Sequence, residues 1–359
     1  MGGSGMARMK EAGRGYAPVP LIDIAPFIVG ERLGQEGVAA EVRAACEEIG
    51  FFLIVGHGFP ETLATRIYDV SRAFFDLPLE EKNAVAETGP VMGGLMHFAL
   101  GEEALAATLG NEAIADLKET LDFGPGFFGD RWPANPPGLE SAWLAYYEAM
   151  SVLAATLRGI FATALALEPD CFEDKFEGHL STLRVIDYPE QRMSPVPGQL
   201  RAGAHSDYGV LTILRTEDAP GGLEVLTRTG SWIGVPHIEG SFVVNIGDAM
   251  MRWTNDRWIS TRHRVANPPA QPGRPTRRQS IAFFHNPARD TVIECLPPFR
   301  EAGGPTKYPA ITYGEYAELR YRQAHGERKQ LRLGTVRGNR PPDVHPPGPG
   351  RDPLPRKRD

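Results

Sequence analysis

The stretch AGAHSDYGVLTIL at residues 202–214 belongs to the part of the chain that decides the fold. It stands in a series of short runs rich in Val, Ile, Thr and Phe, the others being TLRVIDY, GLEVLT, SWIGVP, SFVVNIG, RWISTRHRV and RQSIAFF. Glycine and proline turns separate these runs about every 8–12 residues, which is typical of antiparallel strands rather than of alternating strands and helices. The sequence therefore predicts an antiparallel sandwich or jelly roll over about residues 180–290.

The first half of the chain is predicted to be mainly helical. Apolar residues recur there at helical spacing, and the run FFLIV at residues 51–55 predicts one short strand among the helices. Helices are predicted at about residues 35–49, 63–74, 139–167 and 312–324, the first ended by Gly50 and the second by Pro78. We expect a mainly β protein with α-helices, in which a jelly-roll core is buttressed by N-terminal helices and the last helix packs back on the sheet.

We expect a single domain over residues 18–337. The opening MGGSGM resembles a cloning remnant ahead of a natural start at Met6, so residues 1–17 are expected to be this remnant and a flexible N-terminus. After Arg337 the proline-rich sequence has too few apolar residues to order itself, so residues 338–359 are expected to form a disordered tail.

The composition excludes several classes of protein. Of 359 residues, 42% are apolar and 23% charged, which is typical of a soluble globular protein. A formal charge of −7 gives no general attraction for phosphate backbones, so no nucleic-acid partner is expected. The three cysteines lie far apart without a CxxC spacing, and no apolar run is long enough for a membrane span. We expect a cytoplasmic protein that acts on a small molecule, without a membrane or an obligate protein partner.

Two histidines and one aspartate form a candidate metal site. His205 and Asp207 lie two positions apart at the start of a predicted strand, so both side chains point to the same face. His263 lies in another predicted strand. Two imidazoles and one carboxylate on one face of a jelly roll supply three ligands and leave three octahedral positions open, which is the ligand set of a non-haem Fe(II) oxygenase.

A second pair strengthens this interpretation. Arg278 and Ser280 also lie two apart on one predicted strand, downstream of His263. A buried guanidinium beside a hydroxyl binds a carboxylate well, so the pair would hold the distal carboxylate of 2-oxoglutarate while its keto acid end chelates the iron. A surface ion pair is the ordinary role of an arginine, but this role becomes improbable beside the complete metal set.

With these residues the chain resembles the 2-oxoglutarate- and Fe(II)-dependent dioxygenases of the isopenicillin N synthase-like group, which have a double-stranded β-helix core. The likeness covers about residues 18–290, and it includes the segments PLIDIAPF, GFFLIVGHGFP, DLKE, DYP, VVNIGDAMMRWTNDRWISTRHRV and RQSIAFFHNP. It implies that His205, Asp207 and His263 bind the iron and that Arg278 and Ser280 bind the cosubstrate. Tyr188 matches the family tyrosine whose hydroxyl commonly contacts the cosubstrate.

Two departures from the family concern the pocket. Ile186 stands where plant members carry an asparagine that contacts the cosubstrate, so that polar contact is absent or replaced. Residues 91–110 lack the Tyr-Gly-Tyr pattern often seen there, which affects the expected shape of the pocket lid.

The resemblance implies Fe(II), 2-oxoglutarate and O2 as cofactor and cosubstrates. It implies hydroxylation of an unactivated C–H bond of a small molecule in secondary metabolism or amino-acid modification, although desaturation or ring formation uses the same chemistry. One alternative is an oxidase without 2-oxoglutarate, in which Arg278 and Ser280 hold the carboxylate of the substrate. Another alternative is a non-catalytic jelly-roll module that keeps the metal for structure.

The alternation of side chains along the predicted strands also indicates candidate substrate-binding residues. If Tyr188 faces the pocket, Arg184 on the same predicted strand faces it too. By the same alternation Phe284 points to the same side of its strand as Arg278 and Ser280. Phe284 would form an apolar wall, and Arg184 would attract a carboxylated substrate unless it pairs with an internal Asp or Glu. His57 is expected to lock a turn by hydrogen bonds, and Asn245 and Asp248 are expected to fix a tight turn through bonds to the backbone. The default for His97, His179, His237 and His285 is a solvated or core-satisfied imidazole.

Overall fold

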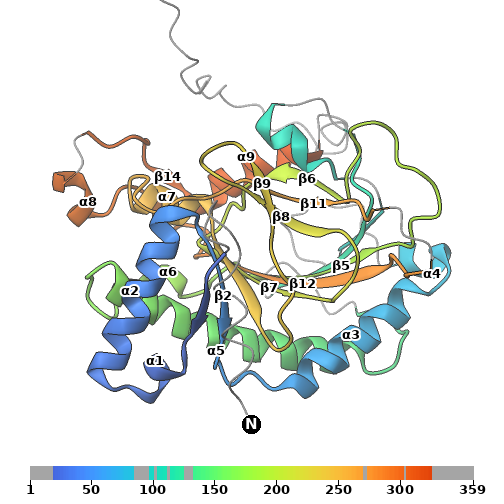
Figure 1. Ribbon diagram of the computed structural model, residues 1–359, viewed down its shortest axis with the longest axis horizontal. Coiled ribbons are helices and arrows are strands. Elements are labelled where there is room, and N and C mark those ends of the chain that lie inside the picture. The colour runs from blue at the N-terminus through green and yellow to red at the C-terminus, as the bar shows by residue number, and fades with distance from the viewer. Residues whose placement is uncertain are drawn as a thin grey trace, which may run out of the picture.

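The computed structural model describes residues 19–84, 97–100, 103–110, 114–124, 132–269, 273–302 and 305–325. Figure 1 shows a large sheet in the middle of the molecule, with α3 (Glu61–Phe75) and α5 (Leu139–Ala164) running below it and a smaller sheet above it. The expectations for residues 1–17 and 338–359 lie outside the described residues, as do residues 91–96, 101 and 102 of the lid segment.

The described strands form a jelly roll from two facing sheets. The large sheet has the order β1-β2-β10-β7-β12-β5-β4-β3, and the smaller one has the order β6-β11-β8-β9. The large sheet comprises β1 (Leu21–Asp23), β2 (Phe51–Val55), β3 (His97–Leu100), β4 (Glu119–Phe123), β5 (Thr182–Tyr188), β7 (Leu211–Thr216), β10 (Phe242–Ile246) and β12 (Arg278–His285). The smaller sheet comprises β6 (Ala202–His205), β8 (Gly222–Leu226), β9 (Trp232–Gly234) and β11 (His263–Ala266), and a separate pair joins β13 (Val292–Ile293) to β14 (Ile311–Thr312).

Strands from both halves of the chain share the large sheet. The parallel pair β1 and β2 extends it at one edge, where β2 pairs with β10. At the other edge β4 pairs with β5, which places a strand from the predicted helical half beside the core of the jelly roll. The sequence predicted β2 but missed β4. The residues of β4, ETLDF, show little alternation between apolar and polar side chains, and the first of them is charged.

The predicted helices are confirmed, with small shifts at their ends. The corresponding helices are α2 (Arg32–Glu48), α3, α5 and α9 (Tyr313–His325). The shorter ones are α1 (Ala25–Val29), α4 (Leu79–Asn83), the 3-10 helix η2 (Leu105–Leu109), α6 (Glu173–Phe176), α7 (Asp248–Trp253) and α8 (Pro297–Ala302). Gly50 follows α2 with φ +69°, and a Cβ there would lie 2.0 Å from the carbonyl oxygen of Ile259, so only glycine fits.

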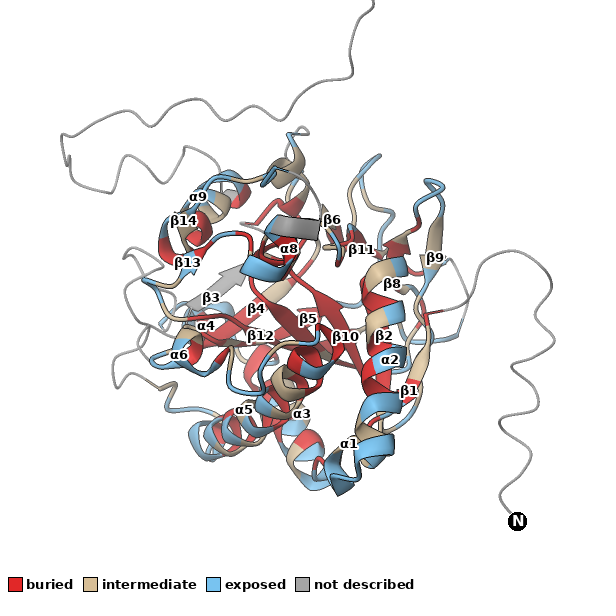
Figure 2. Ribbon diagram, turned by 90° about the vertical axis from the view of Figure 1, so that its left-hand side faces the viewer, coloured by how far each residue is buried: buried red, intermediate tan, exposed pale blue. Residues whose placement is uncertain are grey.

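The main core lies between the large sheet and the helices below it. One face of α5 is fully buried, with Trp143, Tyr146 and Phe161 at 0% exposure, and it packs against apolar residues of β5, β7 and β12. Figure 2 shows this contrast, since the strands are buried while α2 and α5 are exposed on their outer sides. One face of the large sheet packs against this core, and its other face lies toward the smaller sheet.

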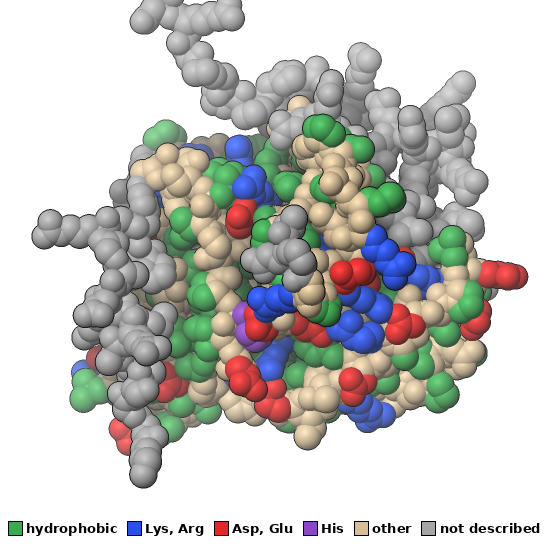
Figure 3. Space-filling model, turned by 45° about the vertical axis from the view of Figure 1, so that its right-hand side comes forward, with side chains coloured by type: hydrophobic (Ala, Val, Ile, Leu, Met, Phe, Trp, Pro, Cys, Tyr) green, Lys and Arg blue, Asp and Glu red, His purple; other side chains and the backbone are tan. Residues whose placement is uncertain are grey.

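None of the helices that the structure describes has the length and apolar character that a membrane span requires. The face in Figure 3 shows Lys and Arg side chains gathered beside Asp and Glu rather than in separate patches. The ion pairs among the described residues include Arg72 with Glu217 and Arg277 with Asp76.

Candidate active site

Three predicted metal ligands converge between the two sheets. His205 ends β6 and His263 begins β11, and the two residues are direct partners across the antiparallel pair. Asp207 follows two residues after His205. Its Oδ1 lies 3.8 Å from Nε2 of His205 and 3.6 Å from Nε2 of His263, and all three ligand atoms lie within 4.8 Å of one another. Atoms this close together could hold one metal ion.

Hydrogen bonds determine which nitrogen of each imidazole faces the carboxylate of Asp207. Nδ1 of His205 lies 2.7 Å from the carbonyl oxygen of Gly203, and Nδ1 of His263 lies 3.1 Å from that of Thr261. A carbonyl oxygen only accepts, so each Nδ1 donates its proton and each Nε2 keeps a lone pair. Burial and the neighbouring His263 lower the pKa of His205, which keeps its imidazole neutral and able to bind a metal.

The carboxylate of Asp207 is held by two neutral donors. Thr212 Oγ1 donates to its Oδ2 at 2.5 Å, and Asn245 Nδ2 donates to the same oxygen at 2.7 Å. Oδ1 is thereby left toward the imidazoles. Burial opposes ionisation, but the two histidines and these two hydrogen bonds together lower the pKa of this carboxyl. The expectation that Asn245 only fixes a turn is wrong, because β7 and β10 are neighbours and place Asn245 opposite Thr212.

Asp248 connects the metal-ligand loop to the C-terminal helix. Its backbone N–H donates to the carbonyl oxygen of Asp207 at 2.8 Å. Its Oδ2 accepts from Tyr316 at 2.7 Å and Arg320 at 2.8 Å, both on α9, and from Ser206 at 3.3 Å. The prediction of a purely local turn role is therefore wrong, since this buried carboxylate ties α9 to the loop that carries Asp207.

The predicted cosubstrate residues share the face of the large sheet that looks toward the smaller sheet. Arg278 is the direct partner of Tyr188 on β5, and Ser280 is the partner of Ile186. Ile186 and Tyr188 pack with Ala202 and other apolar residues of a small cluster that includes the smaller sheet. Where plant members have an asparagine, this chain therefore has an apolar contact.

Arg278 is an incompletely satisfied buried cation. It is 3% exposed, and its Nη1 has no hydrogen-bond partner among the described residues. Ser280 beside it is 2% exposed. An unpaired buried guanidinium is costly, and a carboxylate bound there would satisfy it. The site therefore fits the distal carboxylate of 2-oxoglutarate.

Arg184 is already paired with carboxylates. Its Nε and Nη2 donate to the two oxygens of Asp122 at 2.6 and 2.7 Å, and its Nη1 donates to Glu103 at 3.2 Å. This arrangement favours the alternative in which Arg184 pairs with internal acidic residues over direct capture of a substrate anion. Its Cζ lies 5.8 Å from the ring centre of Phe284, so the two predicted substrate residues are neighbours.

The family segment DLKE connects the site to its surroundings. Asp116 accepts from the backbone N–H of Gly203 at 2.8 Å and of Leu105 at 3.3 Å, which fixes β6 just before His205. Lys118 is 5% exposed and lies 2.7 Å from a carboxylate oxygen of Glu103. The motif therefore supports the strand that carries His205.

Two histidines outside the metal set have the structural roles expected of them. His57 contacts the carbonyl oxygen of Gly240 at 2.8 Å and accepts from the backbone N–H of Phe59 at 3.0 Å, so it locks its turn. His285 is 1% exposed and lies 2.8 Å from both Arg158 and Ser181. The side chain of His97 lies outside the described residues.

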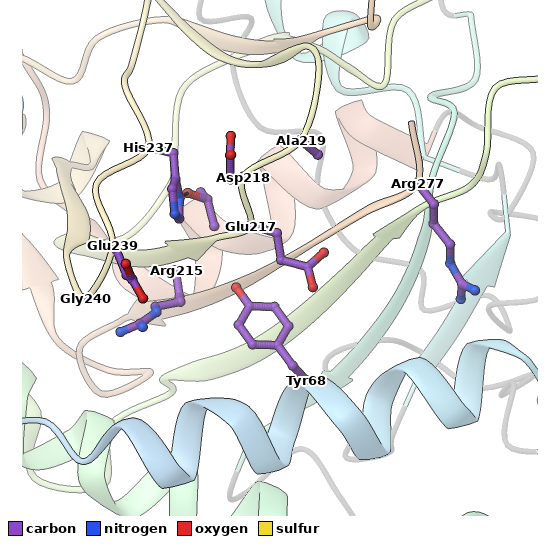
Figure 4. Close-up of a pocket in the computed structure, with 10 residues that line it drawn as sticks. Tyr68, Arg215, Glu217, Asp218, Ala219, His237, Glu239, Gly240 and Arg277 are labelled. Atoms are coloured by element: carbon purple, nitrogen blue, oxygen red, sulfur yellow. Dashed lines mark hydrogen bonds between the residues drawn. The ribbon is translucent and has the colours of Figure 1, made fainter. Parts of the chain in front are cut away.

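A separate hollow of about 430 Å³ opens beside α3 at the end of β7. Figure 4 shows Tyr68 rising from α3 toward Glu217, with Arg215, His237 and Glu239 on one side and Arg277 on the other. None of the site residues predicted from the sequence lines it. Arg215 pairs with Glu61, and Glu217 pairs with Arg72, so its central charges are mutually neutralised.

Comparison with known proteins identifies the family. The family model of the N-terminal region of the non-haem dioxygenase in morphine synthesis matches residues 19–137. The model of the 2OG-Fe(II) oxygenase superfamily matches residues 180–287, the range that carries the residues predicted to bind the metal and the cosubstrate.

Named relatives match nearly the whole chain. The 2-oxoglutarate-Fe(II) type oxidoreductase hxnY of Emericella nidulans is 35% identical, over 86% of this chain and 90% of its own. Validamycin A dioxygenase of Streptomyces hygroscopicus subsp. limoneus is 30% identical, over 94% and 98%. The crystal structure of a full-length Neurospora crassa protein in complex with alpha-KG and thymine has a TM-score of 0.75 at 30% identity, over 84% of this chain and 96% of that one.

The chain belongs to the 2OG-Fe(II) oxygenase superfamily, in its isopenicillin N synthase-like group. It is an Fe(II)- and 2-oxoglutarate-dependent dioxygenase with a jelly-roll core, as the sequence predicted. The family assignment favours this function over an oxidase that does not use 2-oxoglutarate and over a non-catalytic module.

Proposed function

We propose that His205, Asp207 and His263 hold Fe(II) in this dioxygenase. The observation that carries the proposal is the convergence of two imidazole Nε2 atoms on one carboxylate oxygen, with every other polar atom of these three side chains already bonded elsewhere. Two neutral nitrogens and one carboxylate would supply three ligands to Fe(II), and the remaining positions would be available to cosubstrate and O2.

We further propose that Arg278, Ser280 and Tyr188 bind 2-oxoglutarate. Arg278 offers its unpaired Nη1 to the distal carboxylate, and Ser280 adds a hydroxyl from the same strand face. Bound iron, O2 and 2-oxoglutarate together supply the oxidising power for hydroxylation, with succinate and carbon dioxide as coproducts. The chain itself binds and orients these reactants and excludes water from the space between the sheets.

The substrate is proposed to be a small polar molecule of secondary metabolism. The wall beside Phe284 carries Arg184, Asp122 and Glu103 in one ion-paired group, so polar groups of a substrate would meet donors and acceptors there. Because the carboxylates neutralise Arg184, the group does not demand an anionic substrate. The small molecules named for relatives, validamycin A and thymine, are compatible with such a pocket.

We also propose that residues 18–337 form one domain, because the large sheet takes strands from both halves of the chain. We propose a cytoplasmic location and no obligate protein partner. The formal charge of −7 gives no general attraction for phosphate backbones, so no nucleic-acid partner is proposed either.

The test of this function is succinate formation under defined conditions. The purified protein, loaded with Fe(II), should convert 2-oxoglutarate to succinate in air, slowly alone and faster with a coupled substrate. A panel of small polar metabolites read by succinate and by mass spectrometry identifies that substrate. Product formation without 2-oxoglutarate would indicate the oxidase alternative, and iron binding without any oxygen consumption would indicate the non-catalytic alternative.

A further inference from the structure

We propose that Arg201 is a second positive charge of the cosubstrate site and a positioning residue for the distal carboxylate of 2-oxoglutarate. This inference rests on the proposed function of Arg278. Arg201 immediately precedes β6 and is 1% exposed, which makes it one of the largest fully buried side chains in the described chain. Neither the position of Arg201 in the sequence nor its residue type predicted a role in the site.

The guanidinium groups of Arg201 and Arg278 share one aromatic ring. Cζ of Arg201 lies 5.6 Å from the ring centre of Tyr188, and Cζ of Arg278 lies 5.4 Å from it. Each distance lies within the range in which a cation is attracted to an aromatic face. The ring of Tyr188 therefore holds both cations close to the place proposed for the cosubstrate.

Arg201 also fixes the start of the strand that carries Arg278. Its Nη2 donates to the carbonyl oxygen of Thr276, and its Nη1 donates to that of Pro220 at 3.3 Å. Thr276 stands two residues before Arg278. A shift of Arg201 would therefore move both the ring of Tyr188 and the backbone from which Arg278 projects.

Neither cation has a bonded carboxylate among the described residues. The two nearby acidic side chains are used elsewhere, since Asp187 accepts from Arg277 at 3.0 Å and Glu190 accepts the backbone N–H groups of Thr276 and Arg277 at 2.8 Å. Burial and the charge of Arg278 lower the pKa of Arg201, which reflects the cost of holding the two cations together.

Two buried cations without a counterion favour an anion over a neutral ligand of the same shape. The distal carboxylate of 2-oxoglutarate supplies that charge when it binds Arg278. Arg201 then attracts this carboxylate through its positive charge and holds Tyr188 and Arg278 in place, without contacting the carboxylate directly. The consequence is selectivity for a 2-oxo acid that carries a distal charge.

The test compares two 2-oxo acids that differ in that charge. Binding of 2-oxoglutarate and of 2-oxopentanoate, which has a methyl group in place of the distal carboxylate, is measured by calorimetry on the Fe(II)-loaded protein without oxygen. We expect Arg201→Met to weaken 2-oxoglutarate about tenfold and 2-oxopentanoate less than twofold. Equal weakening of both acids would show a merely structural role, and no weakening of either would also overturn the proposal.

Two further variants control for folding. Arg201→Lys retains the charge with a smaller change in shape, and we expect it to keep the preference for 2-oxoglutarate within about threefold of wild type. If Arg201→Met does not fold, loss of the preference in Arg201→Lys would overturn the proposal. Arg158→Met removes a mostly buried arginine that stacks on Phe176 and contacts the other end of β12 at His285, and it should leave the preference unchanged.

The outcomes separate this inference from the proposed function. A wild-type protein that binds neither acid would refute the cosubstrate site itself. A wild-type protein that prefers 2-oxoglutarate, together with an Arg201→Met variant that keeps the preference, would refute only the role of Arg201.

Discussion

The substitution Thr212→Val tests whether the hydrogen bonds on Asp207 tune the metal site. Valine has nearly the size of threonine, so the change removes one donor to Oδ2 at 2.5 Å and leaves the backbone of β7 in place. A hydrogen bond to a charged group contributes about 1.5–3 kcal/mol, and about 1.4 kcal/mol corresponds to a factor of ten in an equilibrium constant. Asn245 still donates to the same oxygen, so we expect the lower end of this range.

The expected result is an Fe(II) affinity about tenfold weaker than that of wild type, because the carboxylate is then less firmly oriented and less easily ionised. The assay is competition with a chelator under anaerobic conditions, together with thermal unfolding of the metal-free protein. The matched control is Thr227→Val, which removes a buried hydroxyl bonded at 3.0 Å to the carbonyl oxygen of Ser231. Iron affinity within twofold of wild type in Thr212→Val, or an equal loss in the control, would refute the reasoning.

Four more substitutions test other parts of the geometry. Asp207→Ala should abolish iron binding and turnover, whereas His57→Ala should mainly lower the unfolding temperature; a fully active Asp207→Ala enzyme would contradict the ligand assignment. Arg278→Ala should raise the KM for 2-oxoglutarate by orders of magnitude, from a loss of about 2–5 kcal/mol, and a change below about threefold would show that another group anchors the cosubstrate. Burial, and after it the charge of Arg158, lower the pKa of His285 well below 6.5. As the pH drops below about 6.5 the unfolded chain therefore binds the proton before the folded protein does, and the free energy of unfolding should fall. Denaturant unfolding of the metal-free protein should show a flatter pH dependence in His285→Gln.

Period-two alternation explains why much of the site was predictable. It places Arg278 with Ser280 on a shared face of β12 without knowledge of the neighbouring strands. The expectation that His205 and Asp207 share a strand was wrong, because β6 ends at His205 and Asp207 lies in the loop that follows it. The apolar spacing of α3 and α5 likewise identifies their buried faces from local sequence alone.

Contacts between strands far apart in the sequence were not predictable in this way. Asn245 bonds to Asp207 only because β10 lies beside β7, and Arg201 reaches Tyr188 only because the two sheets face each other. A polar residue inside the apolar run FVVNI was the available signal for Asn245, since a buried amide needs a partner. The carboxylates around Arg184 come from β4 and from a segment near η2, neither of which the sequence placed.

The most direct test of the central claim is a crystal structure of the protein with Fe(II) and 2-oxoglutarate, prepared without oxygen and measured at the iron absorption edge. The expected result is one anomalous peak bonded by Nε2 of His205, Nε2 of His263 and a carboxylate oxygen of Asp207, with the distal carboxylate of 2-oxoglutarate on Arg278. Iron bound elsewhere, or 2-oxoglutarate bound with its distal carboxylate away from Arg278, would contradict the proposed site.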